Sequence, residues 1–333
     1  MLTFVLILCF IVSGCEKDSS NDGVKAVVII PPGFPSMDFP PDNNFTMARW
    51  ELGKQLFYEK KLSKNNTISC ASCHKQEFAF SDNVALSLGD NNAIGNSNAT
   101  SLANIGYHPY FTRAGGVPTL EMQILVPIQE HNEFNTNMLD VIDKLKLESH
   151  YVQQAQLAYG RDLDAFVITR AISTFERSLI SGNSPYDKYL NDSNLHSLSP
   201  SELRGLQLFM SPQTNCSSCH SGFNFTNFQF ENNGLYLNYA DSGRMRLTNL
   251  PQDRAKFKVP SLRNVAFTAP YMHDGSFTSL QQVIDHYNSG GQPHVNKSIL
   301  VQPLNLTTQE KTDLLHFLNT LSDDSFVRNN IFN

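Results

Sequence analysis

Two short stretches, Cys70-Ala71-Ser72-Cys73-His74 and Cys216-Ser217-Ser218-Cys219-His220, are the most informative part of this chain of 333 residues. Both have the pattern C-x-x-C-H, which is the attachment motif of c-type haem. The two thiols add across the vinyl groups of one porphyrin, and the adjacent His places an imidazole nitrogen on the iron. The sequence therefore predicts two covalently bound haem c groups. Thioether bonds would form at Cys70, Cys73, Cys216 and Cys219, and the proximal iron ligands would be His74 and His220.

Three other roles for these cysteines compete with haem attachment. A zinc site is one, but the two pairs lie too far apart in the sequence for a zinc ribbon. A redox dithiol is another, but it does not need the His that follows both pairs. Disulfides are the third. Cys9 and Cys15 lie at the N-terminus, so haem attachment would leave no cysteine of the body unassigned, and the fold must stand without disulfides.

Composition narrows the class of protein. The chain has 31 acidic and 25 basic residues, a net charge of -6 and 41% hydrophobic residues. The hydrophobic content excludes collagen and coiled coil. The acidic net charge argues against nucleic acid as a partner. The length is enough for one large or two medium domains. The only long apolar run is at the extreme N-terminus, so no internal membrane span is predicted.

The N-terminus has the pattern of an export signal. An apolar run over residues 2–12 ends at Ser13-Gly14-Cys15, and polar residues follow. Small residues before a Cys resemble a bacterial lipobox, so residues 1–15 are predicted to be a lipoprotein-type signal peptide with Cys15 as the lipidation site. An ordinary signal peptide, or a short anchor with an incidental Cys, would also fit. The sequence departs from the pattern in having no Lys or Arg before the run. We expect a periplasmic or cell-envelope protein that meets the membrane only through a lipid anchor, with proline-rich residues 16–45 as an extended linker.

A duplication surrounds the two motifs. Gly53-Lys54-Gln55-Leu56-Phe57 precedes the first motif, and Gly205-Leu206-Gln207-Leu208-Phe209 precedes the second. Phe78-Ala79-Phe80 follows the first, and Phe223-Asn224-Phe225 follows the second. The same order of helix, haem motif and Phe-x-Phe turn thus occurs twice, and the phenylalanines are suited to the apolar wall of a haem.

The fold class follows from this duplication and from helical periodicity. Capping patterns at Thr46, Ser199 and Thr307 mark helix starts, and apolar periodicity predicts helices over 139–147 and 164–179. Strand signals are sparse, with short candidates at 228–230 and 235–239. We therefore predict a mostly α fold with few short strands and two cytochrome c-like domains, each carrying one haem. The predicted bounds are residues 46–195 for the N-terminal domain, 196–325 for the C-terminal domain and 326–333 for a tail.

Between residues 46 and 325 the sequence resembles the bacterial di-haem cytochrome c peroxidase family, which includes the MauG-like proteins. The matching motifs outside the haem sites are Leu52-Gly53-Lys54-Gln55-Leu56-Phe57, Leu120-Glu121-Met122-Gln123, Phe175-Glu176-Arg177, Leu262-Arg263-Asn264-Val265 and Pro270-Tyr271-Met272-His273-Asp274-Gly275. The resemblance implies that peroxide reacts at the N-terminal haem and that the C-terminal haem supplies electrons.

The resemblance also implies two catalytic residues. In the family a Gln and a Glu ten residues apart lie on the distal side of the reactive haem, and Gln123 and Glu133 have that spacing. A carboxylate can move a proton between the two oxygens of peroxide, and an amide can orient the molecule. Alternatively, Glu133 is a solvated loop carboxylate, or Glu130 takes its place. The region that carries a blocking distal His in several members, residues 88–91, has no His, and His108 lies in a different segment. An open N-terminal haem is therefore expected.

The second haem is expected to have an unusual distal ligand. The family places this ligand fourteen residues after the His of its Pro-Tyr-x-His motif, which is His273 here, and the matching residue is Tyr287. Peroxidases have Met at this place and MauG-like proteins have Tyr. A phenolate stabilises ferric iron and should lower the potential of the haem. The alternatives are His286 as the ligand, or Tyr287 as a core aromatic.

Two further features follow from the resemblance. The family usually carries a Trp between the haems, but here Arg113 occupies the matching position, and the only Trp is Trp50. Electron hopping between the haems would then need another route or be slower. The family also binds calcium through an Asn side chain and two backbone carbonyls, and the matching residues are Asn98, Thr268 and Pro270. Oxygen donors suit this cation; alternatively, Asn98 serves only to turn a loop.

These features favour a peroxidase that reduces H2O2 to water with electrons from a small cytochrome c or a cupredoxin. A MauG-like oxidase acting on a protein or organic substrate is the first alternative, because it would explain Tyr287. A non-enzymatic di-haem electron carrier is the second. The family often forms dimers, so a homodimer is also considered, although no residue decides it.

Overall fold

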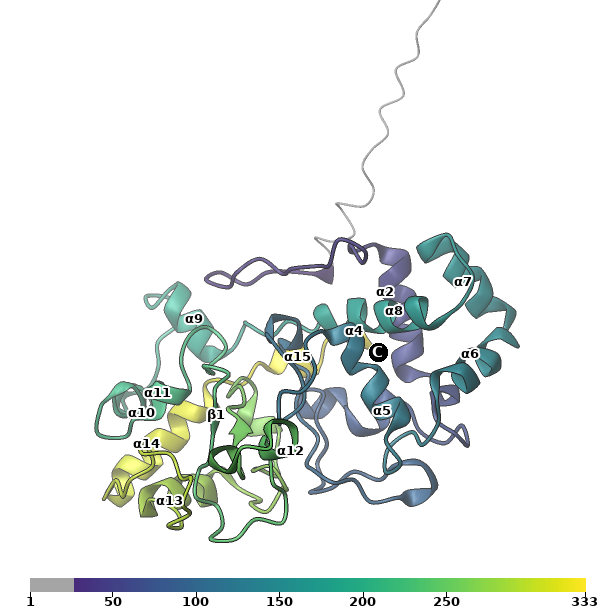
Figure 1. Cartoon of the computed structure of the whole chain (residues 1–333). Coiled ribbons are helices and arrows are strands. Elements are labelled where there is room, and N and C mark those ends of the chain that lie inside the picture. Colours follow the sequence, from purple (N-terminus) through teal and green to yellow (C-terminus); the bar gives the residue numbers. More distant parts are fainter. Residues whose placement is uncertain (1–26) are drawn as a thin grey trace, which may run out of the picture.

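The computed structural model describes residues 27–333. The predictions for residues 1–15, including lipidation of Cys15, lie outside the described residues. The described part is mostly helical with two very short strands, as the sequence predicts. Figure 1 shows two halves side by side, with the earlier helices in purple and teal and the later ones in green and yellow.

The first half contains seven α-helices and four 3-10 helices among the described residues. They are α2 (Met47–Tyr58), η1 (Lys60–Leu62), α3 (Cys70–Cys73), η2 (Gln76–Phe78), η3 (Asp90–Asn92), η4 (Ile105–Tyr107), α4 (Leu120–Gln123), α5 (Leu125–Gln129), α6 (Met138–Lys146), α7 (Ser149–Tyr159) and α8 (Ala165–Arg177).

The second half contains the remaining helices and both strands. They are α9 (Pro185–Asn191), α10 (Pro200–Met210), α11 (Cys216–Cys219), β1 (Phe230–Glu231), α12 (Met245–Thr248), η5 (Pro251–Asp253), β2 (Phe257–Lys258), η6 (Val265–Phe267), α13 (Leu280–Ser289), α14 (Thr308–Asn319), α15 (Asp324–Val327) and η7 (Asn330–Phe332).

The helix starts confirm the capping patterns of the sequence. Thr46 accepts a hydrogen bond from the backbone N–H of Arg49 at 3.2 Å, which begins α2. Ser199 with Glu202 and Thr307 with Glu310 form reciprocal capping boxes at α10 and α14. Each box satisfies backbone donors that a helix N-terminus leaves free. The helices on either side of each motif are therefore held in place partly by local sequence.

Each half is built around one close crossing of two helices. In the first half α2 packs along α8, and in the second α10 packs along α14. A glycine lies at each crossing, Gly53 and Gly205. A Cβ added to Gly53 would come within 1.9 Å of the Ala171 carbonyl oxygen, and one added to Gly205 within 1.9 Å of the Asp313 carbonyl oxygen. The duplicated sequence therefore encodes the same close helix crossing in each half.

Each half also has its own apolar core. In the first core Leu52, Leu56 and Phe57 of α2 are fully buried against side chains of α8 that include Ile168 and Phe175. In the second core, Phe209 of α10, Phe317 of α14 and the loop residue Phe225 pack ring against ring, with centroids 5.1 to 6.5 Å apart. The second phenylalanine of each Phe-x-Phe turn, Phe80 or Phe225, is buried in the core of its own half.

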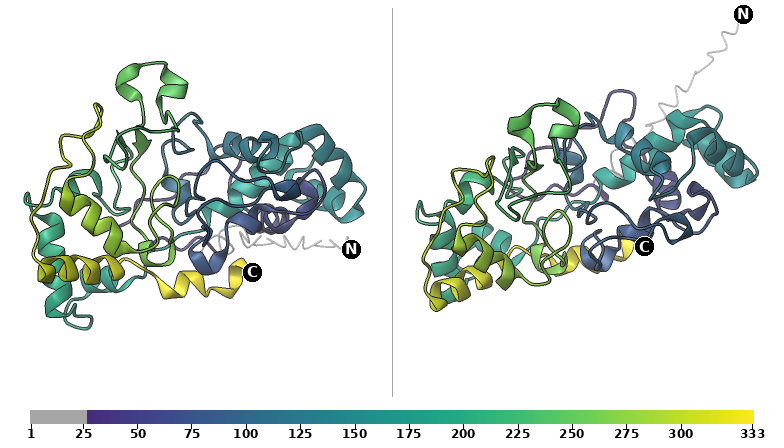
Figure 2. Two further views of the ribbon diagram at one scale, coloured as in Figure 1. Left: turned by 90° about the horizontal axis from the view of Figure 1, so that it is seen from below. Right: turned by 60° about the horizontal axis from the view of Figure 1, so that its bottom comes forward.

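Three segments lie differently from the predicted boundaries. Tyr186 of α9 packs in the second core, so the second half begins before residue 196. Phe326 and Phe332, expected in a tail, pack in the first core beside Phe80. Figure 2 shows this yellow C-terminal end reaching the first half. Val27, Val28 and Phe45 of the proposed linker also pack in the first core.

The strands differ most from the prediction. The first candidate, 228–230, contributes only Phe230 to β1, which pairs antiparallel with β2. The segment 235–239 forms no strand; Leu235 and Tyr239 instead pack in a small cluster with Ala255. A pair of two-residue strands is too short to produce alternation in the sequence, which is why β2 was not predicted.

Two general features can be stated for residues 27–333. None of the helices there is long and apolar enough to cross a membrane. The four motif cysteines form no disulfides, in line with the expectation that the fold stands without them.

Candidate functional site

One cavity connects the two C-x-x-C-H motifs. It has a volume of about 620 Å³ and is lined by all six Cys and His residues of the motifs. The residues of the first subsection that also line it are Gln123, Glu130, Glu133, Tyr287, Asn98, Arg113, Thr268, Pro270 and His108. The structure therefore brings together nearly every residue that the sequence singles out. Trp50 is absent from this lining; it is buried in the first core and donates its indole N–H to Ser178 Oγ at 2.8 Å.

The first motif forms a single helical turn. Ser69 and Ser72 make reciprocal hydrogen bonds at the start of α3, which puts Cys70 and Cys73 on one turn. His74 follows directly, and its ring Nδ1 lies 2.9 Å from the Phe80 carbonyl oxygen. Burial lowers the pKa of His74, so the ring is neutral. A neutral ring that donates Nδ1–H to a carbonyl keeps Nε2 free as an acceptor for a metal.

The second motif repeats this geometry. Cys216 and Cys219 lie on α11, and His220 Nδ1 lies 3.1 Å from the Phe225 carbonyl oxygen. Burial lowers the pKa of His220 as well. The second phenylalanine of each Phe-x-Phe turn thus supplies the carbonyl that orients the motif histidine. The sequence predicted these phenylalanines as the apolar wall of a haem, but Phe80 and Phe225 pack in the cores and do not line the cavity. Their backbone carbonyls carry the contact instead, and a sequence has no direct signal for it.

Both predicted catalytic residues line the cavity. Gln123 ends α4, and its side-chain Oε1 is buried without a hydrogen-bond partner. Glu133 lies in the loop after α5; the residue is exposed as a whole, while its carboxyl is partly desolvated by the surrounding protein. Burial and the neighbouring charge of Glu130 raise the pKa of Glu133 above its usual value. An unpaired amide oxygen and a carboxyl with raised proton affinity therefore border the same space.

A buried ion pair holds α4 in position. Glu121, two residues before Gln123, accepts from both guanidinium nitrogens of Arg177 in α8, at 2.6 and 3.1 Å. Ser173 donates to the same carboxylate at 2.9 Å. Burial raises the pKa of Glu121, but the hydrogen bond and charge of Arg177 outweigh it, so the pKa is lowered overall. The motif containing Glu121 was quoted only for its resemblance, and the structure gives this residue a positioning role.

The structure separates the two candidates for the distal ligand of the second iron. Tyr287 of α13 lines the cavity, and burial raises the pKa of its hydroxyl to about 12. His286 is not part of the lining; its Nε2 lies 2.9 Å from the Asn233 carbonyl oxygen and its ring packs against Phe277. The geometry therefore favours Tyr287.

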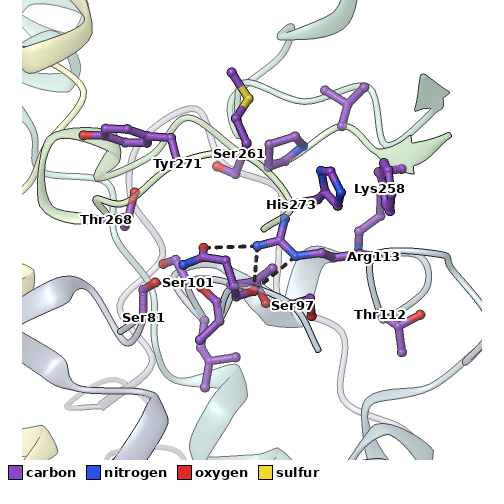
Figure 3. A pocket seen from close by; sticks show the side chains of 18 of the residues that line it. Ser81, Ser97, Ser101, Thr112, Arg113, Lys258, Ser261, Thr268, Tyr271 and His273 are labelled. Atoms are coloured by element: carbon purple, nitrogen blue, oxygen red, sulfur yellow. Dashed lines mark hydrogen bonds between the residues drawn. The ribbon is translucent and has the colours of Figure 1, made fainter. Parts of the chain in front are cut away.

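Positive charge gathers where the two halves meet. Arg113 donates to the backbone oxygen of Asn98 from Nη2 at 2.7 Å and from Nε at 3.2 Å, and Nη2 lies 3.3 Å from Asn98 Oδ1. Figure 3 shows Arg113 between Ser97 and Ser101 on one side and Lys258 and His273 on the other. Burial, followed by the charge of Arg113, lowers the pKa of Lys258 to about 8.

His108 is a cavity residue to which the sequence assigned no role. It follows η4 and is half-buried, and desolvation lowers its pKa well below the usual value. Lys258 Nζ lies 3.3 Å from its Nδ1. Because an ammonium group can only donate, the neutral ring carries its own proton on Nε2. That Nε2 is buried without a partner.

Comparison with known proteins identifies the family. The family model described as di-haem cytochrome c peroxidase matches residues 47–194. Methylamine utilization protein MauG of Methylorubrum extorquens is 32% identical over 290 residues, which cover 86% of this chain and 81% of that protein. The chain belongs to the di-haem cytochrome c peroxidase family.

Other members of the di-haem cytochrome c peroxidase family match over most of their length. Cytochrome c551 peroxidase of Nitrosomonas europaea is 30% identical over 280 residues, which cover 82% of this chain and 80% of that protein. A MauG-like protein associated with microbial copper homeostasis has a similar structure, with a TM-score of 0.87 and 34% identity, covering 92% of this chain and 98% of that one. Both peroxidases and MauG proteins are thus among the relatives.

Membership of the di-haem cytochrome c peroxidase family implies haem c cofactors, and the residues of the cavity fit them. Each motif offers two unbonded thiols and a neutral imidazole with a free Nε2. The unpaired Nε2–H of His108 and the ammonium of Lys258 suit carboxylate groups, which haem carries as its two propionates. The unpartnered Nε2 of His108 is therefore of the kind that a haem propionate satisfies.

The calcium that the family resemblance implies does not fit in the same way. Asn98, Thr268 and Pro270 do line one cavity. However, the Arg113 guanidinium already approaches both oxygens of Asn98. At about 4 Å and an effective dielectric constant of about 20, a guanidinium and a divalent cation repel each other by roughly 8 kcal/mol.

Proposed function

We propose that this protein reduces hydrogen peroxide to water at the haem of the first motif, with electrons delivered through the haem of the second. The reaction is H2O2 + 2 e⁻ + 2 H⁺ → 2 H2O. The observation that carries the proposal is the unpaired Oε1 of Gln123, which lines the same cavity as Glu133 and the first motif. A buried acceptor without a donor is rare in proteins and points to a ligand that supplies the missing hydrogen.

The haem iron would supply the redox centre for this reaction, and the protein side chains would handle the protons. Gln123 can accept a hydrogen bond from a peroxide hydroxyl and so fix its orientation. The Glu133 carboxylate can take the proton from the inner oxygen and deliver it to the outer one, which leaves as water. General acid–base catalysis of this kind contributes about 10²- to 10⁴-fold in rate.

The raised pKa of Glu133 supports this assignment. A carboxylate with an ordinary pKa is a weak general base near neutral pH, because its affinity for the proton that it must accept is low. Burial and the charge of Glu130 bring the pKa of Glu133 closer to neutral pH. Glu121 and Arg177 support the reaction indirectly, because their ion pair fixes the helix that ends at Gln123.

The second motif would receive electrons from a small cytochrome c or a cupredoxin. Tyr287 is proposed as the distal ligand of this iron, which gives the haem a low potential. We also propose export to the periplasm or cell envelope, with a lipid anchor at Cys15, on the basis of the sequence pattern at residues 1–15.

A MauG-like oxidase that acts on a protein or organic substrate is the second candidate function. Tyr287 in the cavity favours this oxidase. A low-potential haem is less suited to be held in the ferrous state as an electron store, and better suited to share oxidising equivalents. Relatives named MauG favour it as well. Arg113 at the place of the usual Trp disfavours it, since oxidation of a docked protein over a long distance needs a redox-active relay.

Stopped-flow mixing of the holoprotein with H2O2 tests the peroxidase. We expect a fast change of one haem spectrum and, with a reduced small cytochrome c or cupredoxin, many turnovers per enzyme. Glu133→Gln should slow the fast step at least 100-fold, whereas Arg161→Gln, on the exposed surface, should not. Reaction with peroxide but no turnover of any donor would favour the oxidase. An unchanged rate in Glu133→Gln together with two permanently six-coordinate irons would favour an electron carrier.

A further inference from the structure

Arg113 is part of a continuous set of hydrogen bonds between the two halves. The backbone N–H of Lys258, in the second half, donates to the Arg113 carbonyl oxygen at 2.8 Å. The Arg113 side chain then donates to the Asn98 carbonyl oxygen at 2.7 Å. The Asn98 backbone N–H in turn donates to the carbonyl oxygen of His273, again in the second half, at 3.0 Å.

The orientation of Asn98 is fixed by its other contacts. Asn98 is buried, and its Nδ2 donates to the carbonyl oxygens of Val84 and Ala85 at 3.1 and 3.3 Å. Oδ1 must therefore face the opposite way, toward Arg113. The backbone oxygen and the side-chain oxygen of one residue thus present two acceptors to a single guanidinium.

No carboxylate neutralises this guanidinium by direct contact. Among residues 27–333, Arg113 forms no ion pair within 4 Å, and the hydrogen bonds of its side chain are all to the oxygens of Asn98. The charges of Asp274 and Asp241 act on it from a greater distance. Backbone and Asn carbonyl oxygens are also among the ligands that a protein offers to calcium.

We propose that the Arg113 guanidinium is the cation of the joint between the two halves, held by both oxygens of Asn98 in place of a calcium ion. Arginine suits this role because its planar fork donates several directed hydrogen bonds and stays charged when partly buried. Calcium needs six to eight oxygen ligands at 2.3–2.6 Å, and it would have to displace the guanidinium to reach Asn98. The protein should accordingly hold its two haem sites together without calcium.

Metal analysis of the purified holoprotein gives the first test. The protein is equilibrated with calcium chloride and desalted, and its calcium and iron contents are measured. We expect two irons and no stoichiometric calcium, and we expect EGTA to leave the visible spectrum, the EPR spectrum and both midpoint potentials unchanged. One calcium per chain, whose removal by EGTA shifts either haem signal, would overturn the proposal.

Variants of Arg113 give the second test. Arg113→Gln removes the cation, so its Tm should fall by several degrees, and added calcium should restore part of the loss. Arg113→Lys keeps the charge and should show no calcium response. Arg161→Gln removes an exposed arginine that pairs with Asp164 and serves as the matched control. If Arg113→Gln matched this control in Tm and in both midpoint potentials, Arg113 would not be the cation of the joint.

The two tests remain separate from the proposed peroxidase. If Arg113→Gln fails to fold, calcium content and the EGTA response of the unaltered protein and of Arg113→Lys still decide the matter. None of these measurements uses peroxide or an electron donor, so a failure here leaves the proposed reaction untouched, and the reverse is also true.

Discussion

Gly53 of α2 lies against the carbonyl oxygen of Ala171 in α8, so closely that a Cβ on Gly53 would come within 1.9 Å of that oxygen. Gly205 has the same relation to Asp313 in the second half, again at 1.9 Å. Both glycines belong to the repeated sequence that precedes a C-x-x-C-H motif. Each motif therefore follows a helix that makes the same kind of close crossing, in which two helix backbones meet with no side chain between them.

Replacing Gly53 by Ala should strongly destabilise the protein. The new methyl group would meet backbone rather than a flexible side chain, so the two helices must separate. Overpacking a core costs about 1–3 kcal/mol and occasionally more, and we expect the upper end of that range. Thermal unfolding of the holoprotein measures it. Gly222→Ala, where the added Cβ has open space and only the positive φ opposes it, is the control with an expected cost of about 1 kcal/mol. Equal Tm values for the two variants would contradict the close packing.

Loss of the Glu121–Arg177 pair should cost about 3 kcal/mol or more, because one charge is left buried without its partner. Arg177→Met tests this in urea unfolding. The pKa of Glu121 is lowered in the folded protein, so the pair stabilises the fold at pH values above the unfolded pKa of about 4.3. That stabilisation is lost as the pH falls through the lower, folded pKa. The difference between the variant and the unaltered protein should therefore shrink in strongly acidic solution. Glu202→Gln, at a half-buried capping residue that makes no ion pair within 4 Å among residues 27–333, is the control.

Peroxide reduction should lose rate on the acid side at a pH above the ordinary pKa of a glutamate. The Glu133 carboxylate must be free to accept a proton, and burial together with Glu130 raises its pKa. The profile of kcat/KM against pH measures this fall in rate, which forms the acidic limb of the profile. Glu130→Gln removes a like charge, so the limb should move to lower pH while the plateau rate stays nearly constant. A limb that remains in place in Glu133→Gln would show that another group titrates.

Replacing Tyr287 by Met should raise the midpoint potential of the second haem, because a thioether replaces an anionic oxygen ligand. Redox titration followed by visible spectroscopy measures the change. His286→Gln is the matched control, since it alters the neighbouring side chain of the same helix without reaching the cavity. If the midpoint potential responded to His286→Gln and not to Tyr287→Met, His286 rather than Tyr287 would be the iron ligand.

The sequence predicted best the features that depend on neighbours along the chain. The helix starts at Thr46, Ser199 and Thr307 each rest on a cap within three residues, and the structure confirms them. The apolar periodicity over 164–179 became α8, which runs over Ala165–Arg177. The spacing of Cys and His within each C-x-x-C-H motif is also local, because attachment of one haem requires it. The motif residues that line the cavity could therefore be named from the sequence.

Features that join distant segments could not be predicted in this way. The pairing of β1 with β2 and the packing of Phe326 and Phe332 on the first core depend on contacts far apart in sequence. The carbonyl of Phe80, which orients His74, carries no side-chain signal. Arg113 was recognised only as a missing Trp, because its hydrogen bonds to Asn98 exist only in the folded protein.

The most direct measurement of the central claim is EPR of the oxidised holoprotein, recorded before and after one equivalent of H2O2. The account predicts signals from two haem irons, of which one has an open or water-bound sixth position and changes on mixing with peroxide. A single haem signal, or two six-coordinate irons that do not respond to peroxide, would contradict it.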